Sequence, residues 1–439
     1  MVTTTPEHIE EEIDKCLVTL SDLRSQQNSF LLIFRLPPEI FEIIFTHGAH
    51  DYYEHDSPSF APHWVNVSYV CRHWRNVAPN CPTLRAYNSS LSLRWTEELL
   101  ARSKQASLKI HLPLRVAPYH VEKVLNHAER IQELQLDIPG DILPTELSLN
   151  APRLQILQIN FWFGSPRRTF TINNGDAVPL RVLKLTHCPL PWHSSFNLSG
   201  VTTLFLSGIP SRSQQSITDV VATPSCMQSL AVLHLDRALA GTRAFLSNEV
   251  FGVSPKVSLP CPARLYVNAP LATVVALLSF INIPSATCVG LEIESDDNSS
   301  ADDYRQLPLV LAQKFSESED PLSSNLAIRS LVIYFATYDS GSTIRASERI
   351  FEPNLSRSYT PEDHNIPLMI RFREVRSRDH IIGNICCSIP SAHAQTLHVV
   401  NPSFSHDFWR KTLGHLDGLQ HLAVCLIWSL CSRSLWPPQ

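Results

Sequence analysis

The spacing of hydrophobic residues predicts a helix close to the amino terminus. Thr5 before Pro6 has the pattern of an N-cap followed by a first-turn proline. A single apolar stripe about 120° wide follows, formed by Ile9, Ile13, Cys16, Leu17, Leu20 and Leu23. This stripe fits either a short coiled-coil dimer or a helix packed on the next domain.

Residues 36–45, LPPEIFEIIF, predict a second helix that is apolar on two sides. At about 100° per residue, the apolar arc covers roughly 200°, about twice what a surface helix needs. Burial of one large apolar side chain contributes about 1.5–3 kcal/mol, so we expect Phe41, Ile44 and Phe45 to be covered. The cover is either a partner protein or the amino-terminal helix, folded back through Ile13, Leu17 and Leu20.

A polar loop is expected at 46–64, and a third helix follows it. Val67, Val70, Cys71, Trp74 and Val77 share one apolar face at helical spacing. Prolines at 79 and 82 should end this helix.

From residue 89 the pattern changes to a recurring LxxLxL unit typical of strands. The five clearest copies are anchored at positions 134, 157, 183, 204 and 233, so the intervals are 23, 26, 21 and 29 residues. Weaker copies begin at 263, 288, 328, 395 and 419, and helical spacing recurs between copies at 97–104 and 120–128. Repeated strand and helix units of this length are typical of a leucine-rich-repeat-like solenoid. A β-sandwich would leave the intervening helices unexplained.

These patterns predict an α/β protein made of four segments. They are an amino-terminal amphipathic helix (1–30), a small helical domain (31–88), an irregular repeat solenoid (89–430) and a tail (431–439). Within the solenoid, the polar stretches 295–303 and 339–365 are expected to be solvent-exposed loops.

The composition of the chain argues against several classes of partner and location. A net charge of -5 gives no broad basic field, so we expect no nucleic acid partner. The acidic amino terminus does not resemble a signal peptide, and no apolar run reaches the roughly 18 residues of a membrane span. Eleven cysteines without CxxC pairs favour reduced thiols, and hence the cytoplasm or nucleus.

Candidate chemistry is sparse. With 13 glycines and neither GxxxxGK[ST] nor GxGxxG, a nucleotide-dependent enzyme is not expected. His47, His50 and His55 fall in the first expected loop, but no further ligand is suitably placed, so we predict neither metal nor cofactor. GxSxG and HExxH are absent from the sequence, which leaves only a dispersed catalytic triad as an enzymatic possibility.

Two motif halves resemble a known family. The order L-P-x-E-I-x-x-x-I-F, a loop, and then V-C-R-x-W-R-x-x-A resembles the F-box of fungal F-box proteins, over residues 33–88. The loop between the halves is longer than in compact F-boxes. The resemblance implies a helical unit that docks on a Skp-type adaptor and through it on a cullin. The adaptor-binding residues that it implies are Leu36, Pro37, Ile40, Phe41, Ile44, Phe45, Val70, Cys71 and Trp74.

The sequence therefore predicts the substrate-recognition subunit of a Skp-cullin-F-box ubiquitin ligase, without enzymatic activity of its own. Strand alternation buries Leu183 and Leu185 and turns Lys184 outward. The same alternation predicts one exposed row on a concave face for an unknown protein substrate, made of Gln135, Gln158, Lys184, Phe205, His234 and Tyr266. The alternatives are an adaptor-bound protein acting outside ubiquitination and a hydrolase with a dispersed triad.

Overall fold

A computed structural model describes residues 5–55, 63–88, 92–114, 116–139, 146–162, 169–173, 180–188, 198–210, 214, 217, 227, 229–240, 257–258, 264–284, 287–294, 301–316, 328–335, 341–347, 368–373, 378–389, 391, 393–400 and 404–425. The chain divides into two compact units. The first holds Met1–Leu157, Phe161–Gly164 and Arg168–Val178, and the second holds Gln158–Asn160, Ser165–Arg167 and Pro179–Gln439. Among the described residues, no helix has both the length and the apolar character needed to cross a bilayer.

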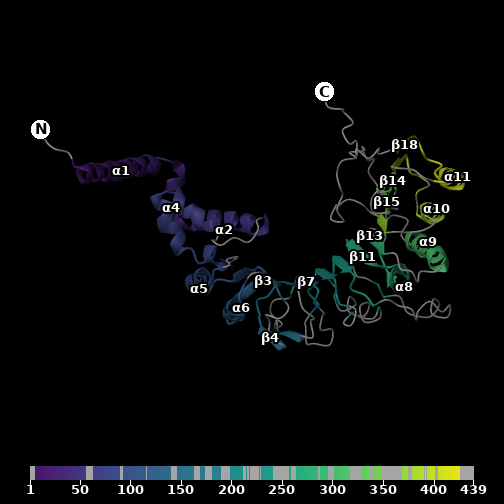
Figure 1. Cartoon of the computed structure of the whole chain (residues 1–439), viewed down its shortest axis with the longest axis horizontal. Coiled ribbons are helices and arrows are strands. Elements are labelled where there is room, and N and C mark those ends of the chain that lie inside the picture. Colours follow the sequence, from purple (N-terminus) through teal and green to yellow (C-terminus); the bar gives the residue numbers. More distant parts are fainter. Residues whose placement is uncertain are drawn as a thin grey trace, which may run out of the picture. The chain divides into compact units, whose positions relative to one another are not determined.

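The first unit is helical at its start and then acquires strands (Figure 1). Its helices are α1 (Pro6–Ser29), α2 (Pro38–His55), α3 (Val67–Val70), α4 (Arg72–Val77), α5 (Leu93–Arg102) and α6 (Pro118–Leu125), with short 3-10 helices η1 (Leu32–Arg35), η2 (His63–Asn66), η3 (Ala78–Asn80), η4 (Leu84–Ala86) and η5 (Ala128–Arg130). Its strands are β1 (Tyr87–Asn88), β2 (Leu108–Leu112), β3 (Ile131–Ile138), β4 (Glu146–Asn150) and β6 (Thr169–Asn173). β5 (Ile156–Phe161) is divided, because its residues Gln158–Asn160 belong to the second unit. β1, β2 and β3 pair in parallel in this order, and β4 pairs in parallel with β6.

The second unit alternates strands with helices. In chain order its elements are β7 (Val182–Thr186), β8 (Thr203–Ser207), β9 (Val232–Asp236), β10 (Val257–Ser258), β11 (Arg264–Pro270), α8 (Leu271–Phe280), β12 (Ile281–Asn282), β13 (Cys288–Glu294), α9 (Ala301–Ser316), β14 (Ser330–Phe335), β15 (Ser342–Ser347), β16 (Leu368–Phe372), α10 (Arg378–Ser388), β17 (Thr396–Val400), α11 (His406–His415) and β18 (His421–Cys425). Its sheet runs β7-β8-β9-β11-β13-β16-β15-β14-β17-β18. Neighbouring strands in it are parallel, except that β15 is antiparallel to both β14 and β16. The protein is therefore mixed α/β with mostly parallel strands.

Helices of the second unit form a layer beside its strands. α8 contacts β11 and β13, and α8, α9, α10 and α11 contact one another in sequence. In Figure 1 these four helices lie together on one side of the strands. Seven of the ten residues of α8 are buried, which explains its nearly continuous apolar sequence.

Strand alternation agrees with the expected pattern. Leu183 and Leu185 on β7 are fully buried while Lys184 between them is not. All ten segments expected to hold strands contain one, and the helical segments at 97–104 and 120–128 coincide largely with α5 and α6. The interval of about 21–29 residues thus corresponds to a repeated strand-containing unit.

A left-handed residue follows each of three neighbouring strands. His187, Gly208 and Arg237 have φ of 54°, 60° and 49°. Each donates its backbone N–H over 2.8 Å to the carbonyl of the next strand, at Ser207, Asp236 and Asn268. Gly208 is required for two reasons. Its φ is positive, and a Cβ at this position would lie 2.6 Å from the His187 ring.

Several expected boundaries were wrong. α2 continues to His55 instead of ending near Phe45, because Ala49 extends the buried series one more turn. The expected helix after the loop is broken at Cys71, whose extended backbone separates α3 from α4. Its sulfur accepts from the Trp74 N–H at 3.4 Å, so this thiol caps α4.

The two polar stretches were also partly misassigned. Residues 301–303 begin α9, and residues 342–347 form β15, which is largely buried between two strands. Sheet pairing satisfies the backbone of β15 despite its polar sequence. Residues 295–300, 348–365 and the tail 431–439 lie outside the described residues.

Candidate protein-docking sites

The core of the helical region uses one of the two apolar faces of α2. Phe41 and Phe45 are 0% and 2% exposed. Both rings pack on Trp74, with centroids 5.9 and 5.0 Å away. The surrounding buried cluster is completed by Ala49, Val77, Ala78, Cys81, Leu84, Tyr87 and Leu99. The expectation that a partner protein or the amino-terminal helix covers Phe41 and Phe45 was therefore wrong, because the core of the helical region itself covers them.

The second apolar face of α2 stays exposed. Ile40, Ile43 and Ile44 are 38%, 64% and 39% exposed, and at 100° per residue they share one side of the helix. We call these three residues the isoleucine face. Tyr69 and Val70, at the end of α3, are exposed as well. Apolar side chains grouped in this way are typical of a protein interaction site.

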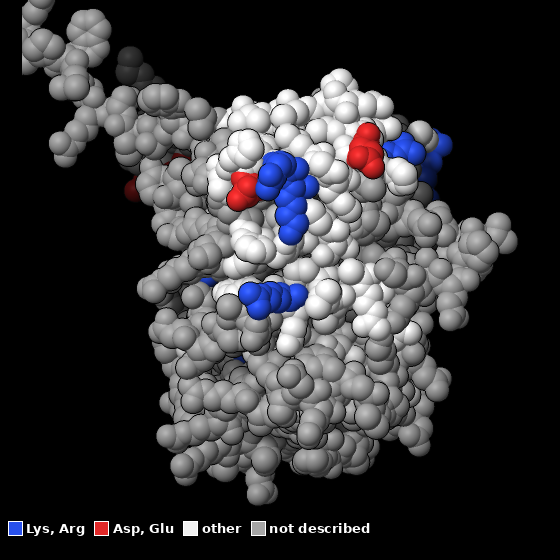
Figure 2. All heavy atoms as spheres, turned by 90° about the vertical axis from the view of Figure 1, so that its right-hand side faces the viewer, with Lys and Arg blue, Asp and Glu red and all other residues white. Residues whose placement is uncertain are grey.

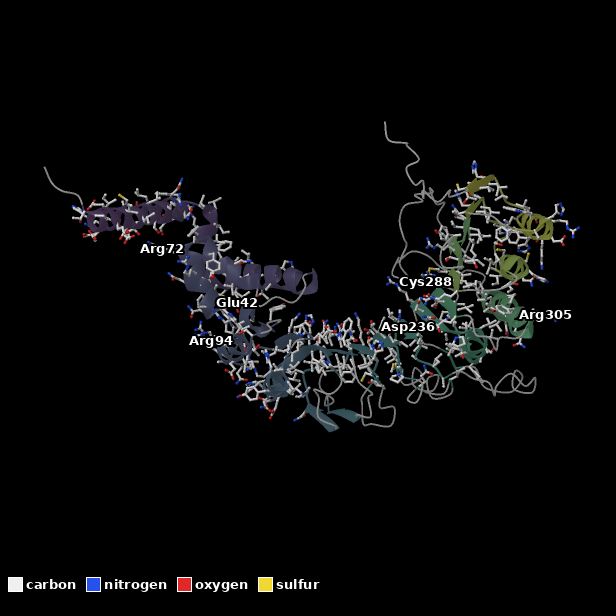
Figure 3. The ribbon with its side chains drawn as sticks, in the orientation of Figure 1. Glu42, Arg72, Arg94, Asp236, Cys288 and Arg305 are labelled. Atoms are coloured by element: carbon white, nitrogen blue, oxygen red, sulfur yellow. The ribbon has the colours of Figure 1, made fainter. Side chains whose placement is uncertain are left out.

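The amino-terminal helix does not cover this face. No residue of α1 is buried, and the stripe that includes Ile13, Leu17 and Leu20 is exposed. α1 is instead connected to α4 through Asp22, which accepts a hydrogen bond from Arg72 at 2.5 Å; Figure 3 labels Arg72. Neither the packing of this stripe on the next domain nor its folding over α2 is seen in the described residues.

The nine residues implied as adaptor contacts thus fall into three groups. The four exposed residues are Pro37, Ile40, Ile44 and Val70. The two fully buried residues are Phe41 and Phe45, and the three partly buried residues are Leu36, Cys71 and Trp74. The most exposed member of the isoleucine face, Ile43, was missing from the set, although its helical angle already pointed to it.

Four of the six residues expected on the strand face form one row. Lys184, Phe205, His234 and Tyr266 are directly paired Cα partners on β7, β8, β9 and β11. Of the other two, Gln135 lies on β3, where its amide donates to Asp137 at 2.9 Å, and Gln158 lies half-buried on β5.

The middle of this row is a stack of three rings, which we call the aromatic stack. His234 lies between Phe205 and Tyr266, with centroid distances of 4.0 and 4.2 Å and interplanar angles of 20° and 21°. Burial lowers the pKa of His234 to about 4, against a smaller opposite effect of Asp236. The imidazole is therefore neutral near pH 7, so the stack presents a continuous half-buried aromatic surface.

A polar row follows the stack two residues further along the strands. Asp236 accepts hydrogen bonds from Ser207 and Asn268, both at 2.7 Å (Figure 3). Next to it, the buried Glu292 accepts from the Tyr266 hydroxyl at 2.6 Å and from Arg373 at 2.5 Å. Sequence analysis missed this row, although its i+2 spacing from the aromatic positions placed it on the same face.

Together these contacts make a rigid surface. Every ring of the stack has a neighbour, and the carboxylates beside it are hydrogen-bonded, so side chains lose little freedom on binding a partner.

The described residues of the aromatic stack and of the polar row show no obvious catalytic or metal-binding centre. Among the described residues, no group of three or more His, Cys, Asp or Glu side chains is placed to hold a metal ion. His47, expected in a loop, lies exposed on α2; His50 and His55 also fall within α2.

Comparison with known proteins adds no family assignment. No protein-family model matches the sequence, and a search of curated proteins found no significant match.

Proposed function

We propose that this chain is the substrate-recognition subunit of a Skp-cullin-F-box ubiquitin ligase. Residues 31–88 would act as the F-box and dock on a Skp-type adaptor. Residues 89–430 would act as a leucine-rich-repeat-like solenoid that holds a protein substrate. Such a subunit would work in the cytoplasm or nucleus.

The observation that carries this proposal is the isoleucine face. The core of the helical region is complete without Ile40, Ile43 and Ile44, because Phe41 and Phe45 fill it. Three exposed isoleucines on one helix face are costly in water unless a partner covers them. These residues also fall within the first motif half that resembles the F-box.

The aromatic stack supports the substrate-binding part. Aromatic residues dominate binding energy at protein interfaces, and a stack that is already ordered avoids part of the entropic cost of binding. The side chains around it carry both signs of charge, including Lys184, Asp236 and Glu292. A mixed surface of this kind suits a protein better than a nucleic acid.

The helix side of the second unit also carries an aromatic cluster, made of Phe404, Phe408 and Trp409 at α11, but Phe408 is buried, so this cluster presents less ring surface than the aromatic stack does. In the described part of the face drawn in Figure 2, basic and acidic side chains are scattered among uncharged atoms. We therefore assign substrate binding to the strand face.

The mechanism is proximity. The adaptor fixes the chain to the ligase, and the strand face holds the substrate so that one of its lysines meets the charged conjugating enzyme. Holding two reactants together raises their effective concentration and lowers the entropic part of the barrier. This chain would then supply binding energy and orientation only.

The alternatives differ in measurable ways. An adaptor-bound protein acting outside ubiquitination would bind the adaptor without recruiting a cullin. A hydrolase would need an accessible nucleophile and base. Thr96 and His120 do approach to 2.6 Å, but both side chains are buried and burial lowers the pKa of His120, so this pair fits an internal hydrogen bond.

Co-expression with a Skp-type adaptor tests the proposal. We expect a stable one-to-one complex that recruits a cullin, and we expect Ile43→Asp and Ile44→Asp to abolish it, since a carboxylate in an apolar interface loses its hydration. Leu309→Asp, at an exposed leucine of α9, is the matched control and should leave the complex intact. Binding that survives both isoleucine variants, with melting temperatures unchanged, would contradict the proposed docking surface.

A further inference from the structure

A pocket of about 570 Å³ lies within the first unit, between the end of the helical region and α5. Its volume is in the range of small-molecule binding sites. Four arginines from three elements line it: Arg75 on α4, Arg85 on η4, and Arg94 and Arg102 on α5. Glu98 is the only carboxylate among its lining residues.

The pocket is therefore strongly basic in an acidic protein. Four arginines and one glutamate give a formal charge of +3, whereas the whole chain carries -5. Glu98 is engaged by Arg102, four residues further along α5. Arginine clusters of this kind recognise phosphate and carboxylate groups through pairs of parallel hydrogen bonds.

Two further features favour an anion. Arg85 is 5% exposed, and its pKa is lowered by burial and then by the nearby Arg102, with Glu98 opposing the shift, so two like charges lie close together in the pocket wall. The first turn of α5 contains no acidic residue and carries Arg94 instead. A cation is unfavourable beside the positive end of a helix dipole, so a bound anion would relieve both repulsions.

Apart from Ser68 and Ser92, the rest of the wall is apolar. Val65, Ala78 and Pro79 line it, and so does the half-buried ring of Trp95. Figure 3 labels Arg94, which lies in the first turn of α5. The pocket thus combines a basic part for an anionic group with an indole surface on which a flat ring can stack.

We propose that this pocket binds a small organic phosphate, with its phosphoryl oxygens on the arginines and its ring system against Trp95. Recognition here would use side-chain guanidinium groups, so it needs no glycine-rich phosphate loop. This proposal is independent of adaptor docking, because the isoleucine face does not line the pocket.

Isothermal titration of the full chain with two probes, ADP and inorganic pyrophosphate, tests the proposal. We expect ADP to bind with one-to-one stoichiometry and to weaken as salt is raised. Arg94→Gln and Arg75→Gln should each weaken both probes at least about tenfold, as expected for loss of one charge-assisted contact. The control Arg24→Gln, at an exposed arginine of α1, should change neither affinity.

The indole is tested separately. Trp95→Phe should weaken ADP more than pyrophosphate, because only ADP carries a ring to stack. The proposal is overturned if neither probe binds at millimolar concentration, or if the arginine variants and the control bind equally well. It is also overturned if a phosphoserine peptide binds more tightly than ADP, since the pocket would then belong to a protein interface. Melting temperatures of all variants exclude unfolding as the cause.

Discussion

The ring of Tyr266 lies directly over Gly290 on the neighbouring strand. A Cβ at Gly290 would be only 3.0 Å from Tyr266 Cδ2. The missing side chain therefore makes room for the ring, whose hydroxyl reaches past it to Glu292 at 2.6 Å. One residue without a side chain thus positions the end of the aromatic stack.

Gly290→Ala should accordingly destabilise the second unit. The ring has little room to move, because His234 stacks on it and Glu292 holds its hydroxyl. We expect a loss of about 1–2 kcal/mol in the free energy of unfolding, typical of an overpacked site. Urea unfolding measures it. Gly414→Ala, in α11 of the same unit, meets no atom within 4 Å and should be neutral or stabilising. Equal effects of the two changes would contradict this account of Gly290.

His234 should make stability fall in acid. Its pKa in the folded chain is about 4, lowered from 6.5 by burial, with Asp236 opposing and Lys184 adding to the shift. Because the pKa of His234 is lower in the folded chain than in the unfolded chain, the unfolded chain binds more protons between these two pKa values. The contribution of His234 to the free energy of unfolding is therefore complete above pH 6.5 and is lost as the pH falls toward 4. The expected loss is up to about 3 kcal/mol.

His234→Phe should keep the stacking and remove this pH dependence. The free energy of unfolding, measured by urea titration from pH 7.5 to pH 4, should fall less steeply for the variant than for the natural chain. Carboxylates titrate in both proteins, so the difference between the two curves isolates the histidine. Parallel curves would show that the imidazole is not buried in the stack.

The two faces of α2 should differ sharply in their effect on stability. Phe41→Ala removes a fully buried ring and should cost about 3–5 kcal/mol. Ile43→Ala, on the exposed face, should change the free energy of unfolding by less than about 0.5 kcal/mol. Thermal and urea unfolding of the separate variants measures both values. A similar cost at the two positions would mean that the isoleucine face is covered within the chain itself.

Removal of residues 1–28 tests the two interpretations of α1. Because its apolar stripe is exposed, we expect light scattering to show a dimer for the full chain and a monomer for the shortened one. Adaptor binding should survive the deletion, because no residue expected to contact the adaptor lies in it. If the full chain is already monomeric, the coiled-coil interpretation of this stripe is wrong.

Local pattern was sufficient for much of the fold. Alternation at Leu183, Lys184 and Leu185 predicted which side of β7 is buried, and the same rule placed Phe205 and Tyr266 in one row. Such predictions succeed because strand and helix periods are properties of the backbone alone. The resemblance of residues 33–88 to an F-box, and the function that it implies, stay predictions.

Contacts with residues that are distant in the sequence decide which apolar face of α2 is buried. Phe41 and Ile44 are both large apolar residues, but Phe41 is fully buried against Trp74, more than thirty residues away, whereas Ile44 is 39% exposed. Similarly, β15 forms from a polar stretch because β14 and β16 supply its hydrogen bonds. The basic pocket could not be foreseen, since Arg75, Arg85, Arg94 and Arg102 come together only when α4, η4 and α5 pack. Periodicity determines where a side chain points, whereas tertiary packing decides what it meets, because those partners come from remote parts of the chain.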